Sequence, residues 1–497
     1  MAQRSNLLRN ICNIALVLFL VVATTGLDSS TLEAKNPPET FADLADKFSP
    51  AVVNISTTSY RGRESDERAG PRQAPRDDSF REFFERRRDP GRRNSRPRGR
   101  RQTSLGSGFI IDKAGYIVTN NHVIESADEI SVTLADDTIL DAIVVGRDEK
   151  VDIALLKVET KKPLPALSWG NSDAARVGDW VIAIGNPFGF SGTVTAGIIS
   201  ARSRNIRVGS YDDYIQTDAS INRGNSGGPL FNMNGQVIGV NTAIFSPSGG
   251  SVGVGFAASS NLIRDVVHDL RKYGRTRRGW IGVQIQSVSE EIALSLGLDR
   301  ARGALVSQVI DNGPAIGAGI ESSDIILTFD GKPIDKMEEL PRVVAATTID
   351  STVDVEVWRE GQRKTIKMRV GELEPEENSQ ISSMDSNHPV KPSDLKEIEL
   401  ADLGVTVVEI SDFVRKKFSL PSSVHGLMVV AIDEFGDAAF KGLRNGDIID
   451  EIQQMKVFNV TDAQVAVQKV KDAQKNIVLV RITTDRGVRY IPVKMAG

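Results

Sequence analysis

The chain has 497 residues, more than one ordinary domain needs and enough for three or four. Hydrophobic residues make up 40% and charged residues 25%, as in soluble globular proteins. Because the formal net charge is −4, the chain as a whole is not built to bind nucleic acid. One cysteine, Cys12, and four histidines far apart in sequence form no metal-ligand motif, so we expect no metal and no other cofactor.

The first residues have the pattern of an export signal. Arg4 and Arg9 precede an apolar run over 11–23, which is too short to span a bilayer comfortably, since a spanning helix needs about 20 apolar residues. We expect a signal peptide over 1–26, cleaved after Gly26, followed by a linker over 27–40. The mature chain then lacks Cys12, so that no disulfide stabilises it. The alternative is an uncleaved segment, and only in that case do we expect association with a membrane.

The folded part is expected to begin with a short helix at residue 41 and a strand over 51–56. Residues 60–101 then lose all periodicity and contain 15 Arg against 8 Asp and Glu, a net charge of +7. Such a composition predicts a long disordered loop. An arginine-rich segment can be a nucleic-acid arm. Because this one interrupts two strands of the same domain, we favour a regulatory insertion and expect no nucleic-acid partner.

Residues 104–258 alternate short apolar runs with Gly, Asn and Asp turns, which predicts an all-β barrel or sandwich. The predicted strands cover 108–111, 117–119, 130–134, 153–158, 180–184, 193–200, 237–242 and 254–257. Residues 259–273 change to helical spacing, with Leu262, Ile263, Val266, Val267 and Leu270 on one face.

The C-terminal half contains an internal repeat. Residues 303–328 align without a gap on 426–451, and eight of the 26 positions are identical. The segment between the two copies, 372–396, is polar and acidic, so we expect a linker there.

Residues 224–229, Gly-Asn-Ser-Gly-Gly-Pro, form the most specific motif. A serine hydroxyl needs a base before it becomes a good nucleophile, and glycines on either side let the backbone turn so that successive N–H groups converge. We therefore consider Ser226 a candidate nucleophile, with the backbone N–H groups of Gly224, Asn225 and Ser226 as an oxyanion hole. The alternative is a glycine-rich turn with an idle serine.

The same residues also satisfy G-x-S-x-G, the nucleophile elbow of α/β-hydrolases. That alternative requires a helix after Ser226 and a catalytic histidine later in the chain, for which His268 and His425 are available. Residues 230–240 instead suggest strand, turn and strand, which contradicts the elbow.

His122 follows an apolar strand and can act as the general base, although a lone histidine is more often structural. Asp152 is placed inside an apolar strand, where an inward carboxylate needs a partner to offset its desolvation. Orienting an imidazole is such a partnership. The nearby acids Asp136, Asp137, Asp141 and Asp148 have turn-like neighbours, and we expect them to be solvated.

The order His, Asp, Ser over an all-β segment is that of chymotrypsin, and residues 41–260 resemble the HtrA/DegP proteases. The motifs that carry the resemblance are Gly106-Ser107-Gly108-Phe109, Thr119 to Ile124, Asp152-Ile153-Ala154-Leu155, Gly185-Asn186-Pro187-Phe188-Gly189, Gln216-Thr217-Asp218-Ala219 and Gly224 to Pro229.

The resemblance implies a mainly β fold, with a chymotrypsin-like pair of six-stranded barrels over 41–274 and two α+β PDZ domains over 275–371 and 397–497. It also implies a periplasmic, ATP-independent serine endoprotease with the triad His122, Asp152 and Ser226. Its substrates would be misfolded or unfolded proteins, and chaperone behaviour, homotrimers and larger cages would accompany the activity. The alternative class is a binding scaffold or holdase in which hydrolysis is secondary.

The two repeats resemble PDZ domains, which bind a C-terminal peptide as an added strand and hold its carboxylate on backbone N–H groups. In the first copy the expected carboxylate loop and edge strand are Gly279, Trp280, Ile281, Gly282 and Val283, with a helix over 340–346 as the other wall. In the second copy the corresponding residues are Leu403-Gly404-Val405. Either copy could instead serve only to pack the assembly.

Two further expectations come from the resemblance. Loops over 186–192, 202–213, 221–225 and 242–252 would control activity by changing between ordered and disordered states. Arg204 or Arg207 could relay a signal from a PDZ domain, and the sequence does not choose between them. The first copy has Ser323-Asp324 where the family has Gly-Asp, as in Gly446-Asp447 of the second, which puts one local turn in doubt.

Overall fold

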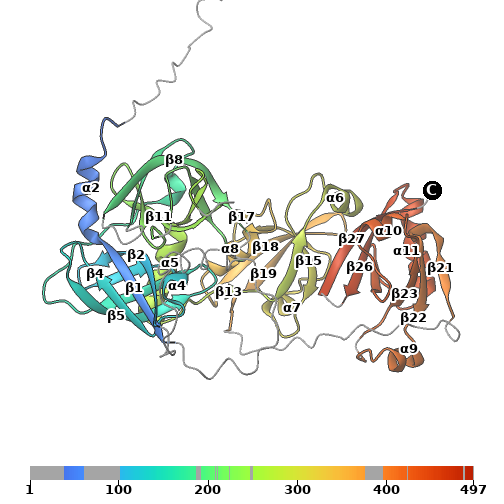
Figure 1. Cartoon of the computed structure of the whole chain (residues 1–497). Coiled ribbons are helices and arrows are strands. Elements are labelled where there is room, and N and C mark those ends of the chain that lie inside the picture. The colour runs from blue at the N-terminus through green and yellow to red at the C-terminus, as the bar shows by residue number, and fades with distance from the viewer. Residues whose placement is uncertain are drawn as a thin grey trace, which may run out of the picture. The chain divides into compact units, whose positions relative to one another are not determined.

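The computed structural model, shown in Figure 1, describes ten stretches of the chain, namely residues 38–60, 101–185, 192–206, 209, 211–222, 224–246, 250–374, 396–422, 424–484 and 487–495. Three kinds of predicted segment therefore lie outside the described residues. They are the signal peptide, the basic insertion between its two end residues, and most of the two linkers over 27–40 and 372–396. The chain divides into two compact units, and the boundary between them falls after Leu44, within helix α2 (Ala42–Phe48). In the described part, no helix is long and apolar enough to cross a membrane.

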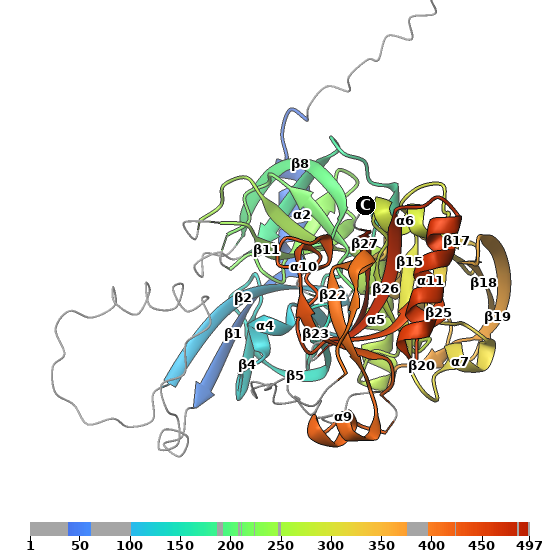
Figure 2. The same cartoon turned by 90° about the vertical axis from the view of Figure 1, so that its right-hand side faces the viewer.

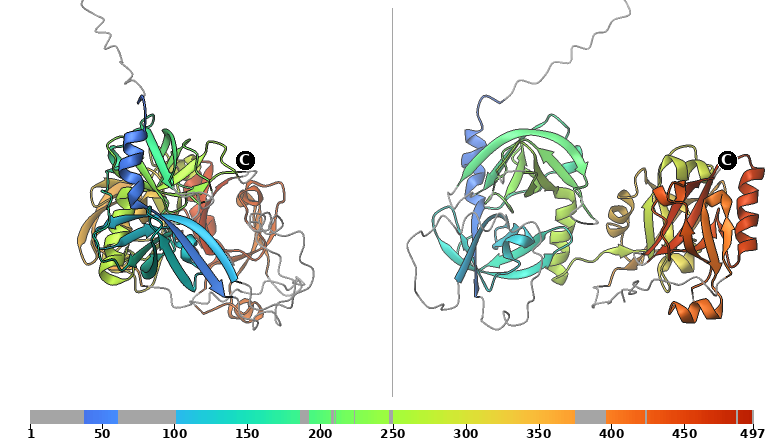
Figure 3. Two further views of the ribbon diagram at one scale, coloured as in Figure 1. Left: turned by 60° about the vertical axis from the view of Figure 1, so that its left-hand side comes forward. Right: turned by 45° about the vertical axis from the view of Figure 1, so that its right-hand side comes forward.

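The first part of the second unit is a closed six-stranded barrel with strand order β1-β2-β3-β6-β5-β4. Its strands are β1 (Val52–Tyr60), β2 (Arg101–Asp112), β3 (Tyr116–Thr119), β4 (Glu129–Thr133), β5 (Ile139–Asp148) and β6 (Ile153–Val158), with the one-turn helix α4 (Asn121–Ile124) after β3. β1 and β2 form a long antiparallel pair (Figure 3, left). That pair places Tyr60 opposite Arg101, so the two ends of the basic insertion are strand neighbours.

A second closed barrel follows, with strand order β10-β11-β12-β9-β8-β7. Its strands are β7 (Trp180–Gly185), β8 (Thr193–Arg204), β9 (Tyr214–Thr217), β10 (Pro229–Asn232), β11 (Val237–Ile244) and β12 (Gly255–Ser259). The 3₁₀ turns are η1 (Ser49–Ala51) before the first barrel and η3 (Ser172–Ala174) before the second. Helix α5 (Ser260–Tyr273) buries Ile263, Val266, Val267 and Leu270 and ends at Gly274, whose φ of 72° closes the helix in the left-handed conformation.

The first repeat folds into a sheet with strand order β14-β15-β16-β18-β19. The strands of this repeat are β13 (Gly279–Trp280), β14 (Val283–Ser287), β15 (Ala304–Val309), β16 (Ile325–Phe329), β17 (Lys332–Pro333), β18 (Thr352–Arg359), β19 (Gln362–Arg369) and β20 (Gly371–Glu372). Of these, β13 and β20 pair with each other in a separate two-stranded sheet. Its helices are α6 (Glu290–Leu296), α7 (Pro314–Ala318) and α8 (Glu339–Ala345).

The second repeat has the strand order β21-β22-β23-β24-β26-β27. Its strands are β21 (Ile398–Leu400), β22 (Val405–Glu409), β23 (Leu427–Ile432), β24 (Ile448–Ile452), β25 (Met455–Lys456), β26 (Ile477–Thr484) and β27 (Gly487–Lys494). Its helices are α9 (Asp412–Lys417), α10 (Asp437–Phe440) and α11 (Val460–Asp472), with the 3₁₀ turn η5 (Ala401–Leu403). Figure 2 shows α11 against β25 and β26. The predicted fold class, two barrels followed by two PDZ-like domains, is confirmed.

The turn in doubt between Glu321 and Ile325 has the same conformation in both repeats. Ser323 has φ of 69° and Gly446 has φ of 95°, so the first repeat places a serine in the left-handed region that favours glycine. The adjacent aspartates, Asp324 and Asp447, are both buried. Arg359 donates to both carboxylate oxygens of Asp324 at 2.6 Å, so the missing glycine does not displace the buried acid.

The turns predicted around Asp141 and Asp148 are wrong, and so is the predicted solvation of Asp148, whereas Asp141 is exposed as expected. Both belong to β5, and Asp148 is buried in an ion pair with Arg278. The arginine is 130 positions away in sequence. Local composition therefore suggested a turn where a distant cation makes a buried carboxylate acceptable.

A second ion cluster joins β20 to the segment before β13, and it gives a pH-dependent prediction. Arg277 donates to both oxygens of Glu372, and Arg275 lies 2.8 Å from the same carboxylate. The hydrogen bonds from Arg277, helped by Arg275, lower the pKa of Glu372 to about 2. A lowered pKa in the folded state means that the carboxylate stabilises the fold above pH 4.5 and loses this effect as the pH falls toward 2.

We expect Glu372→Gln to lower the melting temperature at pH 7 by roughly 1–3 °C. The difference from the parent should shrink between pH 5 and pH 3, as measured by calorimetry. Glu374→Gln, an exposed acid two residues further on, is the matched control and should show no such trend. A difference that stays constant from pH 7 to pH 3 would contradict the assigned ion cluster.

Candidate active site

His122 and Asp152 form a direct pair in the first barrel. The Nδ1 atom of His122 lies 2.5 Å from Oδ2 of Asp152, and the backbone N–H of His122 donates to Oδ1 at 2.8 Å. The imidazole is half exposed, with 46% of its side-chain surface accessible, whereas the carboxylate keeps 17%. The aspartate therefore fixes both the position of the residue and the orientation of its ring. The Nε2 atom is left to exchange a proton with another group.

Asp152 does not lie inside a strand as predicted. It occupies the turn directly before β6, with φ of 56°, and its carbonyl accepts from Asn121 N–H at 3.1 Å and from Asn120 Nδ2 at 2.8 Å. Aspartate and asparagine tolerate the left-handed region better than other non-glycine residues. The turn conformation, not strand alternation, directs this carboxylate to the histidine.

Ser226 lies in the turn before β10, which hydrogen bonds link to the first barrel. Ser107 N–H donates to the carbonyl of Ser226 at 2.9 Å, and Ser107 Oγ donates to the carbonyl of Gly224. A Cβ on Gly227 would lie 2.2 Å from the Ser107 carbonyl oxygen and 3.1 Å from Asn120 N. Only glycine fits there, so the segment carrying Ser226 lies against the residues directly before His122.

The Gly224–Ser226 turn differs in one respect from the predicted oxyanion hole. Gly224 has φ of 97°, as a tight glycine turn requires. Asn225 N–H donates to the Asn222 carbonyl at 3.0 Å and is therefore already used. Among the described residues, Gly224 N–H and Ser226 N–H have no acceptor. These two groups are the candidate donors in this conformation.

The α/β-hydrolase alternative does not fit the structure. Ser226 is followed by β10, a turn and β11, without the helix that a nucleophile elbow requires. His268 is exposed on α5, and His425 stacks on Phe458 in the second repeat with 5.1 Å between ring centroids. Of the described histidines, His122 is the one that lies two residues after Asn120, whose backbone the Ser226 turn approaches.

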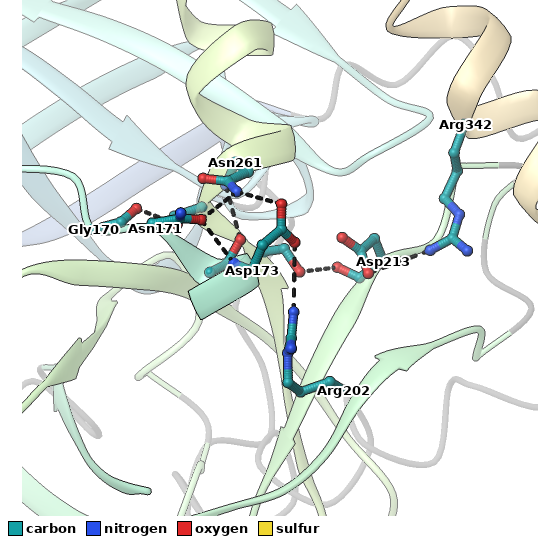
Figure 4. Close-up of polar contacts among 10 residues, drawn as sticks. Gly170, Asn171, Asp173, Arg202, Asp213, Asn261 and Arg342 are labelled. Carbon is teal, nitrogen blue, oxygen red and sulfur yellow. Dashed lines mark hydrogen bonds and ion pairs between the residues drawn. The ribbon is translucent and has the colours of Figure 1, made fainter. Parts of the chain in front are cut away.

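A polar network outside the candidate triad holds β8 against η3 and α5 (Figure 4). Asn261 Nδ2 donates to Asn171 Oδ1 and to Asp173 Oδ2, both at 2.7 Å, and Arg202 reaches Asp173 at 3.5 Å. Arg204, one of two predicted relay residues, donates to Gln216 on the neighbouring strand β9. Arg207, the other, lies outside the described residues.

Sequence reasoning missed Arg342 on α8, which reaches the segment before β9. Its Nη1 lies 3.3 Å from Oδ1 of Asp213 and 3.4 Å from the Asp212 carbonyl (Figure 4). The carbonyl of Asp213 in turn accepts from Ser259 at the end of β12. No local pattern singles out this arginine, because its partner is 129 positions away.

The predicted peptide-binding residues of the first repeat have four different placements. Gly279 and Trp280 form β13 and pair with β20. The side chain of Ile281 is buried in the domain core. Gly282, with φ of 76°, packs against the Trp280 ring. Val283 begins β14, half exposed.

A free strand edge and free donors remain beside these residues. In the described part of the sheet, β14 pairs with β15 alone, and the N–H groups of Ile281 and Gly282 have no acceptor. This arrangement suits strand addition with carboxylate capture.

Within the described residues, no group of three or more His, Cys, Asp or Glu side chains is arranged to hold a metal ion.

Comparison with known proteins agrees with the geometry. The family model described as "Trypsin-like peptidase domain" matches residues 106–240, and the family model described as "PDZ domain" matches residues 279–370. Two barrels with a paired His and Asp beside a glycine-flanked Ser define a chymotrypsin-like serine endopeptidase.

Relatives of similar length narrow this class to one family of endopeptidases. A probable periplasmic serine endoprotease DegP-like from Rhizobium meliloti (strain 1021) is 39% identical over 502 residues, covering 95% of this chain and 97% of that protein. One of the same description from Ectopseudomonas mendocina (strain ymp) is 41% identical, covering 97% and 99%. The solved structure "HtrA-type protease AlgW with decapeptide" is 39% identical with a TM-score of 0.55, covering 68% of this chain and 100% of that one. The chain belongs to the DegP-like, HtrA-type family of periplasmic serine endoproteases.

Proposed function

We propose that Ser226, His122 and Asp152 are the catalytic triad with which this endopeptidase cleaves unfolded or misfolded proteins without ATP. The observation that carries the proposal is the His122–Asp152 pair beside the loop of Ser226. His122 would accept the Ser226 proton through Nε2 as the hydroxyl attacks the peptide carbonyl, and would return it to the leaving amine. Water would then hydrolyse the acyl-enzyme by the same route.

The charge that develops on the substrate carbonyl oxygen needs donors already in place. Gly224 N–H and Ser226 N–H are the groups we assign, with Asn225 N–H joining only if the bond to Asn222 breaks. Removing one such donor typically lowers the rate by about 100- to 1,000-fold. A direct test of the whole proposal is degradation of labelled casein by the purified chain in ATP-free buffer. Absence of degradation at every enzyme concentration would favour the holdase alternative.

Assembly and chaperone activity are the finer parts of the proposal. We infer homotrimers, with larger cages under some conditions, and protection of unfolded proteins as a second activity. Family membership supports both inferences. We also propose that the basic residues between Tyr60 and Arg101 are a regulatory insertion, since they leave and re-enter the barrel at neighbouring strand ends.

The first repeat is proposed to take peptides with a free, apolar C-terminus. The unpaired edge of β14 and the free N–H groups of Ile281 and Gly282 support this role. A peptide can activate the protease only if it binds the active state more tightly than the resting state. We propose that Arg342 conveys that difference; its contact from helix α8 to Asp213 before β9 supports this role.

We expect such a peptide to raise the cleavage rate of a chromogenic substrate by about five- to 150-fold, the range of ordinary allosteric coupling. Amidating its C-terminus should remove most of the effect. Val343→Glu, on the half-exposed side of α8, should weaken activation, whereas Glu338→Gln, directly before the same helix, should not. Replacing Ile281 by a charged residue would be a poor test, because its side chain is buried. Equal activation by free and amidated peptides would contradict carboxylate capture.

A further inference from the structure

The two repeats share one groove architecture, which allows a residue-by-residue comparison. Val283 and Ile285 of β14 pair with Val309 and Val306 of β15. Val405 and Val407 of β22 pair in the same way with Ile432 and Val429 of β23. The register of each pair shifts by one residue at the same position, and both β14 and β22 follow a left-handed glycine, Gly282 or Gly404. β22 is therefore the groove strand of the second repeat.

The two groove strands differ at the edge that faces away from the repeat's own sheet. β14 has a free edge, as described above. β22 pairs on that edge with β21, antiparallel, with Ile398 opposite Val407 and Leu400 opposite Val405 (Figure 1). An added peptide strand in a PDZ domain occupies this edge. Residues 398–400 of the same chain fill it here.

Side-chain burial in β21 follows the alternation expected of a bound peptide. Leu400 is 6% exposed and belongs to the core cluster that contains Val405, Val407 and the inner face of α11. Ile398 packs against the same cluster, whereas Glu399 between them is exposed. The apolar side chains of alternate residues thus enter the groove, as strand geometry requires.

The side chains of the two groove strands differ in exposure, as expected if only the second groove is filled. Val405 and Val407 are 2% and 0% exposed, whereas Val283 and Ile285 at the equivalent positions are half exposed. The donors differ as well. Gly404 N–H donates to the Ala401 carbonyl at 3.1 Å, whereas Gly282 N–H has no acceptor among the described residues. The Ala401 carbonyl thus accepts from the Gly404 N–H group, which would otherwise be free to donate to a peptide carboxylate.

We propose that residues 398–400 are an internal ligand of the second repeat, which fills its peptide groove, so that an extended apolar C-terminus binds there only after β21 leaves. This inference does not depend on the proposed triad or on activation through the first repeat. A closed groove lowers the apparent affinity for a peptide by the fraction of time for which the groove is open.

The test uses the full chain with Ser226→Ala, so that peptides are not cleaved, and with Cys12→Ser, so that no native thiol remains. The probe is a fluorescent peptide with the sequence of residues 396–400, Lys-Glu-Ile-Glu-Leu, and a free C-terminus. Glu399→Cys together with Thr406→Cys places two cysteines at a cross-strand pair, within the Cα separation that a disulfide spans. Oxidation should lock β21 in place, and reduction should release it.

We expect the disulfide to form within one chain. At saturating probe, the reduced form should bind one more peptide per chain than the oxidised form, and amidated probe should not show the difference. Failure of the disulfide to form in a folded chain would overturn the proposal, as would equal capacity in the two forms.

A release variant provides the opposite change. Leu400→Asp should raise the affinity of the second repeat for the probe by about tenfold or more. Glu399→Gln, on the outward face of the same strand, is the matched control and should leave it unchanged. If Leu400→Asp unfolds the second repeat, the cysteine pair decides alone. A folded Leu400→Asp chain without a gain in probe binding would contradict the internal ligand.

Discussion

Ser226→Ala should lower the rate of casein cleavage by about four orders of magnitude or more, because loss of a triad nucleophile leaves only the contributions of binding and the oxyanion hole. The half-buried Ser226 side chain is small, and its carbonyl, which Ser107 holds, is unchanged by the substitution. The fold should therefore survive with an unaltered melting temperature. Initial rates with labelled casein, together with thermal unfolding, measure both expectations.

Ser220→Ala is the control for this experiment. Ser220 is an exposed serine six positions before Ser226, and its contacts with Thr195 and Asn225 use its backbone carbonyl. Its replacement should leave cleavage close to the parent rate. Substantial residual cleavage by the purified Ser226→Ala chain would remove Ser226 from the mechanism.

Asp152→Asn should lower kcat by about 10⁴-fold with little change in KM or in stability. Asparagine has the same shape and tolerates φ of 56°, so the turn before β6 should persist. The amide can still accept from the His122 backbone N–H, but its NH₂ group would then face Nδ1. The imidazole would carry its proton on Nε2, where it cannot accept one from Ser226.

Asp137→Asn is the matched control, because Asp137 is an exposed aspartate with φ of 64°. It tests whether changing a left-handed aspartate alone impairs the enzyme. We expect parent-like kcat and KM for this control. A parent-like kcat for Asp152→Asn would mean that the 2.5 Å contact between Asp152 and His122 has no role in proton transfer.

Much of the fold could be predicted because local patterns carried it. β6 begins and ends where its apolar run does, and α5 follows the predicted helical spacing within one residue. The two repeats shared enough glycine, alanine and aspartate positions to indicate one module folded twice. The Gly-Asn-Ser-Gly-Gly motif was similarly informative, since its glycines are needed for the turn itself.

The features that could not be predicted depend on distant contacts or on backbone conformation. β5 was missed because Asp141 and Asp148 resemble turn residues until Arg278 is placed beside Asp148. Asp152 was assigned to a strand because alternation does not report a left-handed turn. β21 falls within the predicted second PDZ domain over 397–497, but it was not predicted as a strand, since three residues give no period.

Reaction with a fluorophosphonate, which modifies only an activated serine, tests the central claim most directly. We expect one adduct per chain, mapped by mass spectrometry to Ser226. It should be lost in Ser226→Ala, strongly slowed in His122→Ala and unchanged in His268→Ala. An adduct on another serine, or labelling of Ser226 that persists without His122 and disappears without His268, would contradict the assigned triad.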